Sequence, residues 1–396
     1  MSEIRVTNIL GENGNSPVNF TKGINMSGIV TATAFIPSQG QLSHRNIIIN
    51  GAMNVAQRAS SSTANGYGDL DRWKHEYVGT NENPTFAQAS LTTSDTPYTL
   101  GLTKTYKLTN GNQTSGLQAS SQINFNQQIE AQDIRNSGWD YKNPNSYITL
   151  SFWVRSSVSQ NFNGFVKTAD GSMYIYPYET GTLSANTWTK ITKSIPGNSN
   201  LQIDDDNGSG FQVFPIAIYG TNMTNNSVTY NQWAGWSSGG RSKDQANSWF
   251  TTNDATLEIT GVQLEVGPVA TPFEHRSFGD ELRRCQRYYF RLPYQGVGNS
   301  GGVLLGSGKE TGSTARVCVI FPAPMRAIPS CAASNLIADD ETSATSANTI
   351  NQVLASSVEP DRARIQFTGG SYSSGNSISL ATNAATNSYL EGSAEL

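Results

Sequence analysis

Residues 257–290 limit the possible folds most strongly, because their pattern changes three times within one short segment. The segment begins with the alternating apolar residues of a half-buried strand: Leu257, Ile259, Val262 and Leu264. A slip of one residue at Gly261 within this alternation predicts a β-bulge. Pro268 and Pro272 then prevent both strand and helix from continuing, so the chain is expected to leave the sheet.

A short helix is expected directly after these prolines. Ser277 is suited to cap its first turn, where Asp280 and Glu281 place negative charge at the positive end of the helix. Apolar residues then recur at spacings of three and four, as in a helix-packing seam: Phe278, Leu282, Cys285, Tyr289 and Leu292. We therefore predict a helical linker over 276–292, ended by Pro293, that joins two β domains.

The seam also predicts how the chain assembles. A helix of this length is marginally stable alone, and the sequence contains no second helix that would cover its apolar side. We therefore expect a homotrimer in which the seam packs near the threefold axis.

The scarcity of charge favours an all-β chain. Of the 396 residues, 14% are charged and 10% are aromatic, and an aromatic content this high is atypical of disordered chains. Abundant Gly, Ser, Thr and Asn suit a β fold with many turns. The net charge of −4 argues against a nucleic-acid partner, which requires a basic face.

Targeting and redox signals are weak. The first ten residues lack the basic start and apolar core of a signal peptide. No run approaches the ~20 apolar residues of a membrane helix, so membrane insertion is not expected. The scattered cysteines Cys285, Cys318 and Cys331 indicate neither a disulfide framework nor a zinc site, which predicts folding in a reducing cytoplasm without a metal or other cofactor.

The pattern divides the chain into four parts. Residues 1–45 hold too few apolar residues to close a core and are interpreted as an attachment arm, with a disordered leader as the alternative. Residues 46–275 are expected to form an antiparallel jelly-roll β-sandwich, and 293–396 a distal C-terminal β domain beyond the linker. The expected strands are 147–154, 187–195, 211–219 and 257–266 in the sandwich, and 313–321, 362–368 and 377–381 in the distal domain.

Two features are expected near the start of the sandwich. A first strand is predicted over 47–55, broken at the Asn-Gly turn dipeptide at 50–51. Trp73 is large enough to anchor a core. Arg72 is expected to pair with Asp71, either buried beneath Trp73 or at the surface.

Signals for catalysis or metal binding are few. The histidines His44, His75 and His275 lack the spacing of a metal or hydrolase motif. The acidic run 204–206 before Asn-Gly at 207–208 lacks the ligand spacing of a calcium loop, so a solvated hairpin tip is preferred. Polysaccharide cleavage needs two carboxylates that face each other across a cleft, and no motif here identifies them. We therefore expect a protein that is not an enzyme.

Aromatic residues are the main candidates for ligand binding, because sugars stack on aromatic rings. Tyr174, Tyr176 and Tyr178 alternate and therefore share one face of a strand. A Gly- and Ser-rich stretch adds three rings: Trp233, Trp236 and Trp249. These six residues are the predicted glycan-binding set, and the alternative is that the rings fill the core or a subunit interface.

Several motifs resemble parts of one family. The junction GVQLEVGPVATPFEHRSFGDELRRCQRYYF, the triplet DRW, the segment FPAPMRAIP and the terminal SAEL all resemble segments of tail fibre and receptor-binding proteins of tailed phages. MSEIRVTNILGENG and GIVTATAF are similar to the first residues of fibre proteins from marine phages. The order of YITLSFWVRSS, TWTKITKSI and LEITGVQLE resembles jelly-roll carbohydrate-binding modules.

The resemblance implies a protein of the virion tail, folded in the host cytoplasm before assembly. It would dock on a phage tail or nozzle protein through residues 1–45 and attach the virion to host surface polysaccharide. The sandwich would then grip glycan laterally, and the polar loops of 293–396 would select the host. A polysaccharide depolymerase tailspike and a purely structural baseplate or decoration protein are the alternatives.

Overall fold

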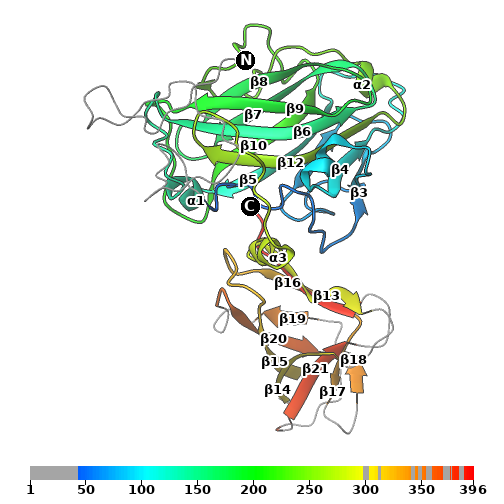
Figure 1. The fold of residues 1–396 in the computed structure, drawn as a ribbon. Coiled ribbons are helices and arrows are strands. Elements are labelled where there is room, and N and C mark those ends of the chain that lie inside the picture. Colours follow the sequence, from blue (N-terminus) through cyan, green and yellow to red (C-terminus); the bar gives the residue numbers. More distant parts are fainter. Residues whose placement is uncertain are drawn as a thin grey trace, which may run out of the picture. The chain divides into compact units, whose positions relative to one another are not determined.

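Two facing sheets form the largest part of the chain. The computed structural model describes residues 43–297, 303–310, 314–339, 344–346, 350–353, 359–368, 375, 377–382 and 388–396. Within these residues, the first sheet has six antiparallel strands, in the order β1 (Ser61–Ser62), β3 (Thr85–Ser90), β4 (Lys104–Thr109), β12 (Thr256–Val266), β6 (Tyr147–Ser156) and β9 (Thr189–Pro196). The described strands of the second sheet are β11 (Ala234–Gly235), β8 (Tyr174–Leu183), β7 (Gln160–Thr168), β10 (Ser209–Tyr219), β5 (Gln122–Glu130) and β2 (Lys74–Val78). Figure 1 shows the two sheets stacked as a sandwich.

The core of the sandwich follows from the alternation of apolar residues along the strands. The fully buried inward residues of β6 are Ile148, Leu150, Phe152 and Val154. Burial of such a side chain stabilises the fold by about 1.5–3 kcal/mol. The strands predicted at 147–154, 187–195, 211–219 and 257–266 correspond to β6, β9, β10 and β12, so the predicted all-β antiparallel sandwich is confirmed. Short helices lie in the connections: η1 (Thr96–Leu100), α1 (Ala131–Arg135) and α2 (Ser248–Thr251).

The predicted β-bulge lies in β12. Its pairing with β6 shifts register between Thr260 and Gln263, and Gly261 has a φ of 62°. The extra residue shifts the inward–outward alternation of the side chains by one position. Ile259 before the bulge and Val262 after it therefore both face the core. The bulge prediction is confirmed.

The strand predicted over 47–55 is wrong. This segment is irregular, although Ile48, Met53 and Val55 are fully buried. Polar side chains replace a strand partner: the amide of Gln127 accepts from Ile49 N (2.8 Å) and donates to Ile49 O (2.7 Å). A buried segment can leave the sheet in this way because side chains satisfy its backbone groups.

The predicted helix is shorter than expected. It is α3 (Phe278–Gln286), and it begins as predicted: Ser277 is the N-cap and accepts a hydrogen bond from Asp280 N at 3.2 Å. The chain then enters β13 (Tyr289–Val297), so Tyr289 and Leu292 lie on a strand. The continuous helical seam over 276–292 is therefore wrong.

The buried side of α3 packs within the same chain. Cys285 is fully buried in a cluster with Ile49, Val55 and Tyr288, against which Leu282 packs. Phe278, the first residue of the expected seam, is 47% exposed. Leu282 and Cys285 thus find partners on the sandwich side of their own chain, whereas Leu292 packs against the core of the second β region. The homotrimer stays a prediction.

A second β region follows α3. A three-stranded sheet contains β13, β22 (Ser388–Ser393) and β16 (Ser330–Ser334). The other described strands form one sheet, in the order β18 (Ala344–Ser346), β17 (Leu336–Asp339), β21 (Ser377–Thr382), β14 (Leu304–Glu310), β15 (Thr314–Ile320), β20 (Arg362–Thr368) and β19 (Ile350–Val353). The strands predicted at 313–321, 362–368 and 377–381 are confirmed as β15, β20 and β21.

The last residues of the chain return to the sandwich. Glu395 accepts hydrogen bonds from the buried guanidinium of Arg72 and from Arg58. The hydroxyl of Tyr67 donates to the carbonyl of Leu396 at 3.0 Å. The guanidinium carbon of Arg72 lies 3.4 Å from the ring centre of Tyr288, which follows α3. Segments near the start, middle and end of the described chain therefore meet at one point.

The predicted pairing of Arg72 with Asp71 is wrong. Arg72 is buried, as in the first of the two expected arrangements, but its carboxylate partner is Glu395. Asp71 instead accepts hydrogen bonds from the backbone and side chain of Gln57, the former at 2.9 Å. Neighbouring residues can point to different partners because Arg72 has a φ of 72°, which redirects its side chain.

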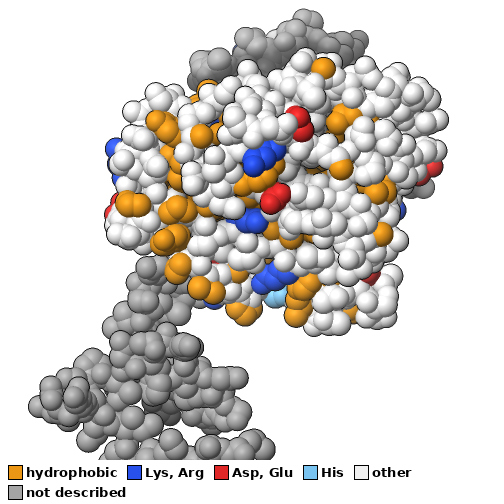
Figure 2. Space-filling view, turned by 90° about the horizontal axis from the view of Figure 1, so that it is seen from above, with side chains coloured by type: hydrophobic (Ala, Val, Ile, Leu, Met, Phe, Trp, Pro, Cys, Tyr) orange, Lys and Arg blue, Asp and Glu red, His pale blue; other side chains and the backbone are white. Residues whose placement is uncertain are grey.

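Most of the predicted attachment arm, residues 1–42, lies outside the described residues. Among the helices that the structure describes, none is both long and apolar enough to cross a membrane. Figure 2 shows a face on which few charged side chains lie among hydrophobic and uncharged polar ones, as the low charge content of the sequence suggests.

Candidate functional site

The predicted tyrosines lie on one side of β8, but that side faces the core. Tyr176 and Tyr178 are 3% and 0% exposed, and Tyr174 is partly buried against the same core. The hydroxyl of Tyr178 donates to the carbonyls of Phe214 (3.2 Å) and Pro215 (3.1 Å). The rings of Tyr176 and Tyr178 have no face that a sugar can reach, so their assignment to a glycan surface is corrected to the core, and Tyr174 packs partly against that core.

The three predicted tryptophans lie in different environments. Trp249 is fully buried in the main core, where its indole N–H donates to Thr256 O at 3.1 Å. Trp233 is half-buried, packs edge-on to Tyr176 and donates to Pro196 O at 2.7 Å. Trp236 is half-buried on the outer side of the second sheet, beside Phe165. The structure does not bring these rings together, and Trp236 is the member that remains a candidate for ligand contact.

The acidic run at 204–206 forms a turn. Asp206 accepts from Gly208 N at 2.8 Å, and Asp204 N donates to Asp170 at 2.9 Å. Within the described part of the chain, no group of three or more His, Cys, Asp or Glu side chains is placed to hold a metal ion.

The three histidines are separate. His75 is fully buried, stacks on Phe86 with ring centres 4.1 Å apart and contacts the hydroxyl of Tyr106 at 3.0 Å. His44 accepts from Arg284 at 2.9 Å, and His275 lies at another place on the first sheet. These positions give no catalytic or metal-binding grouping.

A cavity of about 530 Å³ lies on the outer side of the first sheet, next to the bulge. We call it the outer groove, and its main lining residues are Leu100, Trp153, Lys190, Gly261, Phe273 and His275. Its volume is in the range of cavities that hold small ligands.

The floor of the outer groove follows from alternation and from the bulge. Because Phe152 and Val154 face the core, Trp153 between them faces outward, and Lys190 of β9 is its direct cross-strand neighbour. A Cβ atom at Gly261 would lie 2.8 Å from Leu102 and 3.4 Å from Trp153, at a φ that side chains rarely adopt. Glycine therefore keeps the floor open beside the indole ring.

The wall of the outer groove is the segment that leaves the sheet after β12. Its backbone is anchored to strand side chains: Thr271 N donates to Glu265 at 2.8 Å, and Glu274 N donates to Gln263 at 2.8 Å. This anchoring holds Phe273 over the groove. The opposite wall is η1, where the carbonyl of Leu100 lies 2.9 Å from His275 Nε2. A carbonyl accepts only, so Nε2 carries the proton in this arrangement.

A second aromatic ring, that of Trp188, lies with Arg155 on the same outer side of the first sheet. Arg155 lies over the ring of Trp188 at 4.8 Å, and both donate to Asp95, at 2.6 Å from Arg155 and 2.8 Å from the indole N–H. Burial acts to raise the pKa of Asp95, but hydrogen bonds from Thr92 and Trp188 and the charge of Arg155 together hold it below its ordinary value. The ionised carboxylate thus fixes the orientation of Trp188 and Arg155.

The outer groove is suited to binding a polar ligand that has an apolar face. Trp153 and Phe273 offer ring surface, and Lys190 and the backbone around Thr271 offer hydrogen-bonding groups. None of its described lining residues is a carboxylate, so the pair needed for glycoside hydrolysis is not present there. Sequence reasoning missed Trp153, although the alternation of YITLSFWV places it opposite the core residues.

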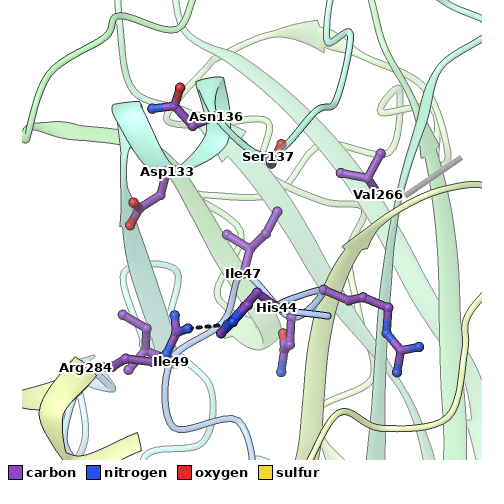
Figure 3. Close-up of a pocket in the computed structure, with 10 residues that line it drawn as sticks. His44, Ile47, Ile49, Asp133, Asn136, Ser137, Val266 and Arg284 are labelled. Atoms are coloured by element: carbon purple, nitrogen blue, oxygen red, sulfur yellow. Dashed lines mark hydrogen bonds between the residues drawn. The ribbon is translucent and has the colours of Figure 1, made fainter. Parts of the chain in front are cut away.

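A smaller cavity of about 210 Å³ lies near the first described residues. Figure 3 shows the guanidinium of Arg284 directed at His44, with Asp133 and Asn136 across the cavity. Burial, with a contribution from Glu130, raises the pKa of Asp133. Its lining mixes one carboxylate, basic groups and the apolar Ile47 and Val266, a combination that suits no single ligand class.

Comparisons with known proteins give the following similarities. No family model matches the sequence, and no curated protein matches it. The enzymatically active domain of tailspike protein 4 from bacteriophage CBA120 aligns with a TM-score of 0.30 and 11% identity, over 56% of this chain and 21% of that chain. A putative sugar-binding protein from Bacteroides thetaiotaomicron aligns with a TM-score of 0.30 and 13% identity, over 56% of this chain and 100% of that one. A CBM4 structure aligns with a TM-score of 0.28 and 11% identity, over 55% and 98%. Similarity at this level carries no inference about the ligand of this chain.

Proposed function

We propose that this chain is a tail fibre protein of a tailed phage, which attaches the virion to a glycan of the host surface and does not cleave it. The support for the tail fibre role is the resemblance of the junction after β12, the DRW triplet and the terminal SAEL to phage fibre proteins. The support for glycan binding is the outer groove.

The fibre-like motifs are also physically connected. The arginine of DRW binds the glutamate of SAEL, and its guanidinium lies on Tyr288 of the motif QRYYF. Three segments that resemble one family therefore form one buried contact.

The observation that carries the glycan proposal is the arrangement of the half-buried rings of Trp153 and Phe273 around a cavity of about 530 Å³, which Lys190 also lines. Saccharides place C–H faces on aromatic rings and hydroxyls on nearby donors and acceptors. The proposed site lies in the sandwich, and the distal loops of 293–396 are proposed to contribute host selection.

The test uses Trp153→Ala. We expect the full-length variant to lose at least tenfold affinity for purified host surface polysaccharide and to block phage adsorption less than the wild type does. Tyr141→Ala is the matched control, because Tyr141 is a half-buried ring outside the outer groove. Equal binding by wild type and Trp153→Ala, with both folded, contradicts the assignment of the groove.

The proposal that the protein binds without cleaving has a separate test. Incubation of host polysaccharide with the wild-type protein is expected to leave its viscosity and its content of reducing ends unchanged. A fall in viscosity with release of oligosaccharides would favour the depolymerase alternative. A protein that binds neither polysaccharide nor host cells would favour a purely structural role in the virion.

A further inference from the structure

Three basic residues lie next to one another on the larger sheet of the second β region. They are Lys309 of β14, Arg316 of β15 and Arg364 of β20, on three strands that are neighbours in that sheet. Lys309 and Arg316 are direct cross-strand partners, and Arg364 is the partner of Cys318, two positions along β15 from Arg316. Because Val317 between them is fully buried, Arg316 and Cys318 face away from the core. We call the three basic residues the cationic patch.

A cavity of about 260 Å³ lies at the cationic patch. Its described lining consists of the patch residues with Ser307, Gly308 and Cys318. None of these is a carboxylate. Lys309 and Arg364 are exposed and Arg316 is half-buried, so a ligand in solution reaches all three. The volume is just below that of pockets for drug-sized ligands, ~300–1,000 Å³, which suits a single charged sugar unit.

The arrangement of charge in the cationic patch is unfavourable for the protein alone. Like charges directly opposite each other on neighbouring strands destabilise a sheet. Among the described residues, no carboxylate forms an ion pair with any of the three patch residues. By contrast, Arg362 at the start of β20 is paired with Asp361 at 2.6 Å. The whole chain has a net charge of −4, so a group of three uncompensated cations is unusual in it.

The guanidinium of Arg316 is already oriented. Its Nε donates to Oε1 of Gln366 at 3.0 Å, and Gln366 is its cross-strand partner on β20. Among the described residues, the two terminal nitrogens of Arg316 have no partner. An oriented side chain loses less conformational freedom when it binds a ligand, and the terminal nitrogens of arginine form the fork that binds carboxylate and phosphate groups.

We propose that the cationic patch binds the anionic group of a sugar in the host surface glycan. An anion between the three cations offsets their mutual repulsion. Arginine and lysine form strong charge-assisted hydrogen bonds with carboxylate and phosphate oxygens, and the hydroxyl of Ser307 both donates to and accepts from sugar hydroxyls. The inference rests on the proposed attachment to glycan and deepens it, because it gives the distal domain a site and the ligand a charge.

The test compares anionic sugars with neutral partners by isothermal titration calorimetry on the full-length protein. The probes are tetragalacturonate with its fully methyl-esterified form, sialyllactose with lactose, and glucose 6-phosphate with glucose, which separates carboxylate from phosphate ligands. At least one anion is expected to bind tenfold or more tightly than its neutral partner, with affinity that falls as salt is added. The inference is overturned if no anionic probe binds better than its neutral partner.

Lys309→Gln and Arg364→Gln are expected to remove this preference. Their Tm is expected to be no lower than that of the wild type, because each substitution relieves repulsion within the cationic patch. Lys142→Gln is the matched control: it makes the same change in charge at an exposed lysine of the sandwich and should keep the preference. If both patch variants bind the anion as the wild type does, the anion binds elsewhere and the inference fails.

Cys318 provides a second readout at the site itself. Its thiol is exposed and lines the cavity, whereas Cys285 is fully buried and Cys331 is half-buried. A saturating amount of the preferred anion is expected to slow the reaction of Cys318 with a fluorescent maleimide at least threefold, with Cys318→Ser as the background. The neutral partner should leave the rate unchanged. An unchanged rate with the anion bound contradicts the assignment of the cavity.

This site and the outer groove fail independently. Trp153→Ala changes the outer groove alone and is expected to keep the preference for anions. Normal binding of neutral polysaccharide by Trp153→Ala contradicts only the outer groove, and absence of the anion preference in the wild type contradicts only the cationic patch.

Discussion

Asp71 is a carboxylate held in a fully buried position without an arginine in direct contact. It accepts hydrogen bonds from Gln57, while Arg72 next to it binds Glu395. Burial raises its pKa from 3.8 to about 6, and the charge of Arg58 and the bonds from Gln57 offset only part of that effect. Between about pH 4 and 6, the folded protein therefore holds a proton at this site that the unfolded chain releases.

Stability is predicted to depend on pH through Asp71. Between pH 4 and 6 the unfolded chain is ionised here and the folded protein is not, so the free energy of unfolding falls as pH rises, by roughly 3 kcal/mol in total. Below pH 4 both states are protonated, and above pH 6 both are ionised, so the contribution is constant there. Urea unfolding of wild type and Asp71→Asn at pH 4, 5, 6 and 7 should give a difference that changes over this window. Parallel profiles for the two proteins would show that the carboxyl titrates normally.

At the scale of elements, α3 depends on its cap and on its contacts with the sandwich. The hydroxyl of Ser277 binds Asp280 N, which is one of the backbone donors that a helix leaves unpaired at its start. The buried side of the helix packs through Cys285 on Ile49 and Val55. A helix of nine residues is stable because of these contacts, since isolated helices of this length are marginal.

Ser277→Ala is expected to lower the free energy of unfolding by about 1 kcal/mol, because the cap bond is lost. Ser277→Asn is the matched control, since an asparagine oxygen accepts the same bond and should preserve most of the stability. Both values come from urea titrations at one pH. A loss of the same size in both variants would mean that the serine acts through something other than its cap.

For the whole molecule, the contact between Glu395 and Arg72 joins the end of the chain to the sandwich. Both side chains are almost fully buried, with exposed fractions of 6% and 1%. Removing one partner of such a pair leaves an uncompensated buried charge, which costs more than the loss of a surface ion pair. The homotrimer and the docking role of residues 1–45 stay predictions, and a native mass measurement would check the first of them.

Glu395→Gln is predicted to lower the free energy of unfolding by roughly 3 kcal/mol, because the guanidinium of Arg72 stays buried without its carboxylate. Glu391→Gln is the control: its partner Arg291 is 18% exposed and Glu391 itself is 25% exposed, so a loss of about 1 kcal/mol or less is expected. Thermal and urea unfolding of the two variants provide the comparison. If both variants lose similar free energies of unfolding, burial does not make the ion pair between Glu395 and Arg72 more important for stability than the more exposed pair.

Local patterns in the sequence determined the strands, the bulge at Gly261 and the N-cap at Ser277. Each of these features depends on residues only a few positions apart in the sequence. Alternation of apolar residues and the residue preferences of helix caps therefore predict them directly. The end of α3 was not predicted correctly, because Tyr289 and Leu292 fit a helical spacing equally well and only their pairing with β22 makes them a strand.

The tertiary structure alone decided what the candidate residues face. Alternation put Tyr176 and Tyr178 on one side of a strand, but it does not say which side of a sandwich strand is covered. The partner of Arg72 lies 323 residues away, and the outer groove combines η1, β6, β9 and the segment after β12. Contacts between such distant segments leave no periodic signal in the sequence, because they arise only when the sheets have packed.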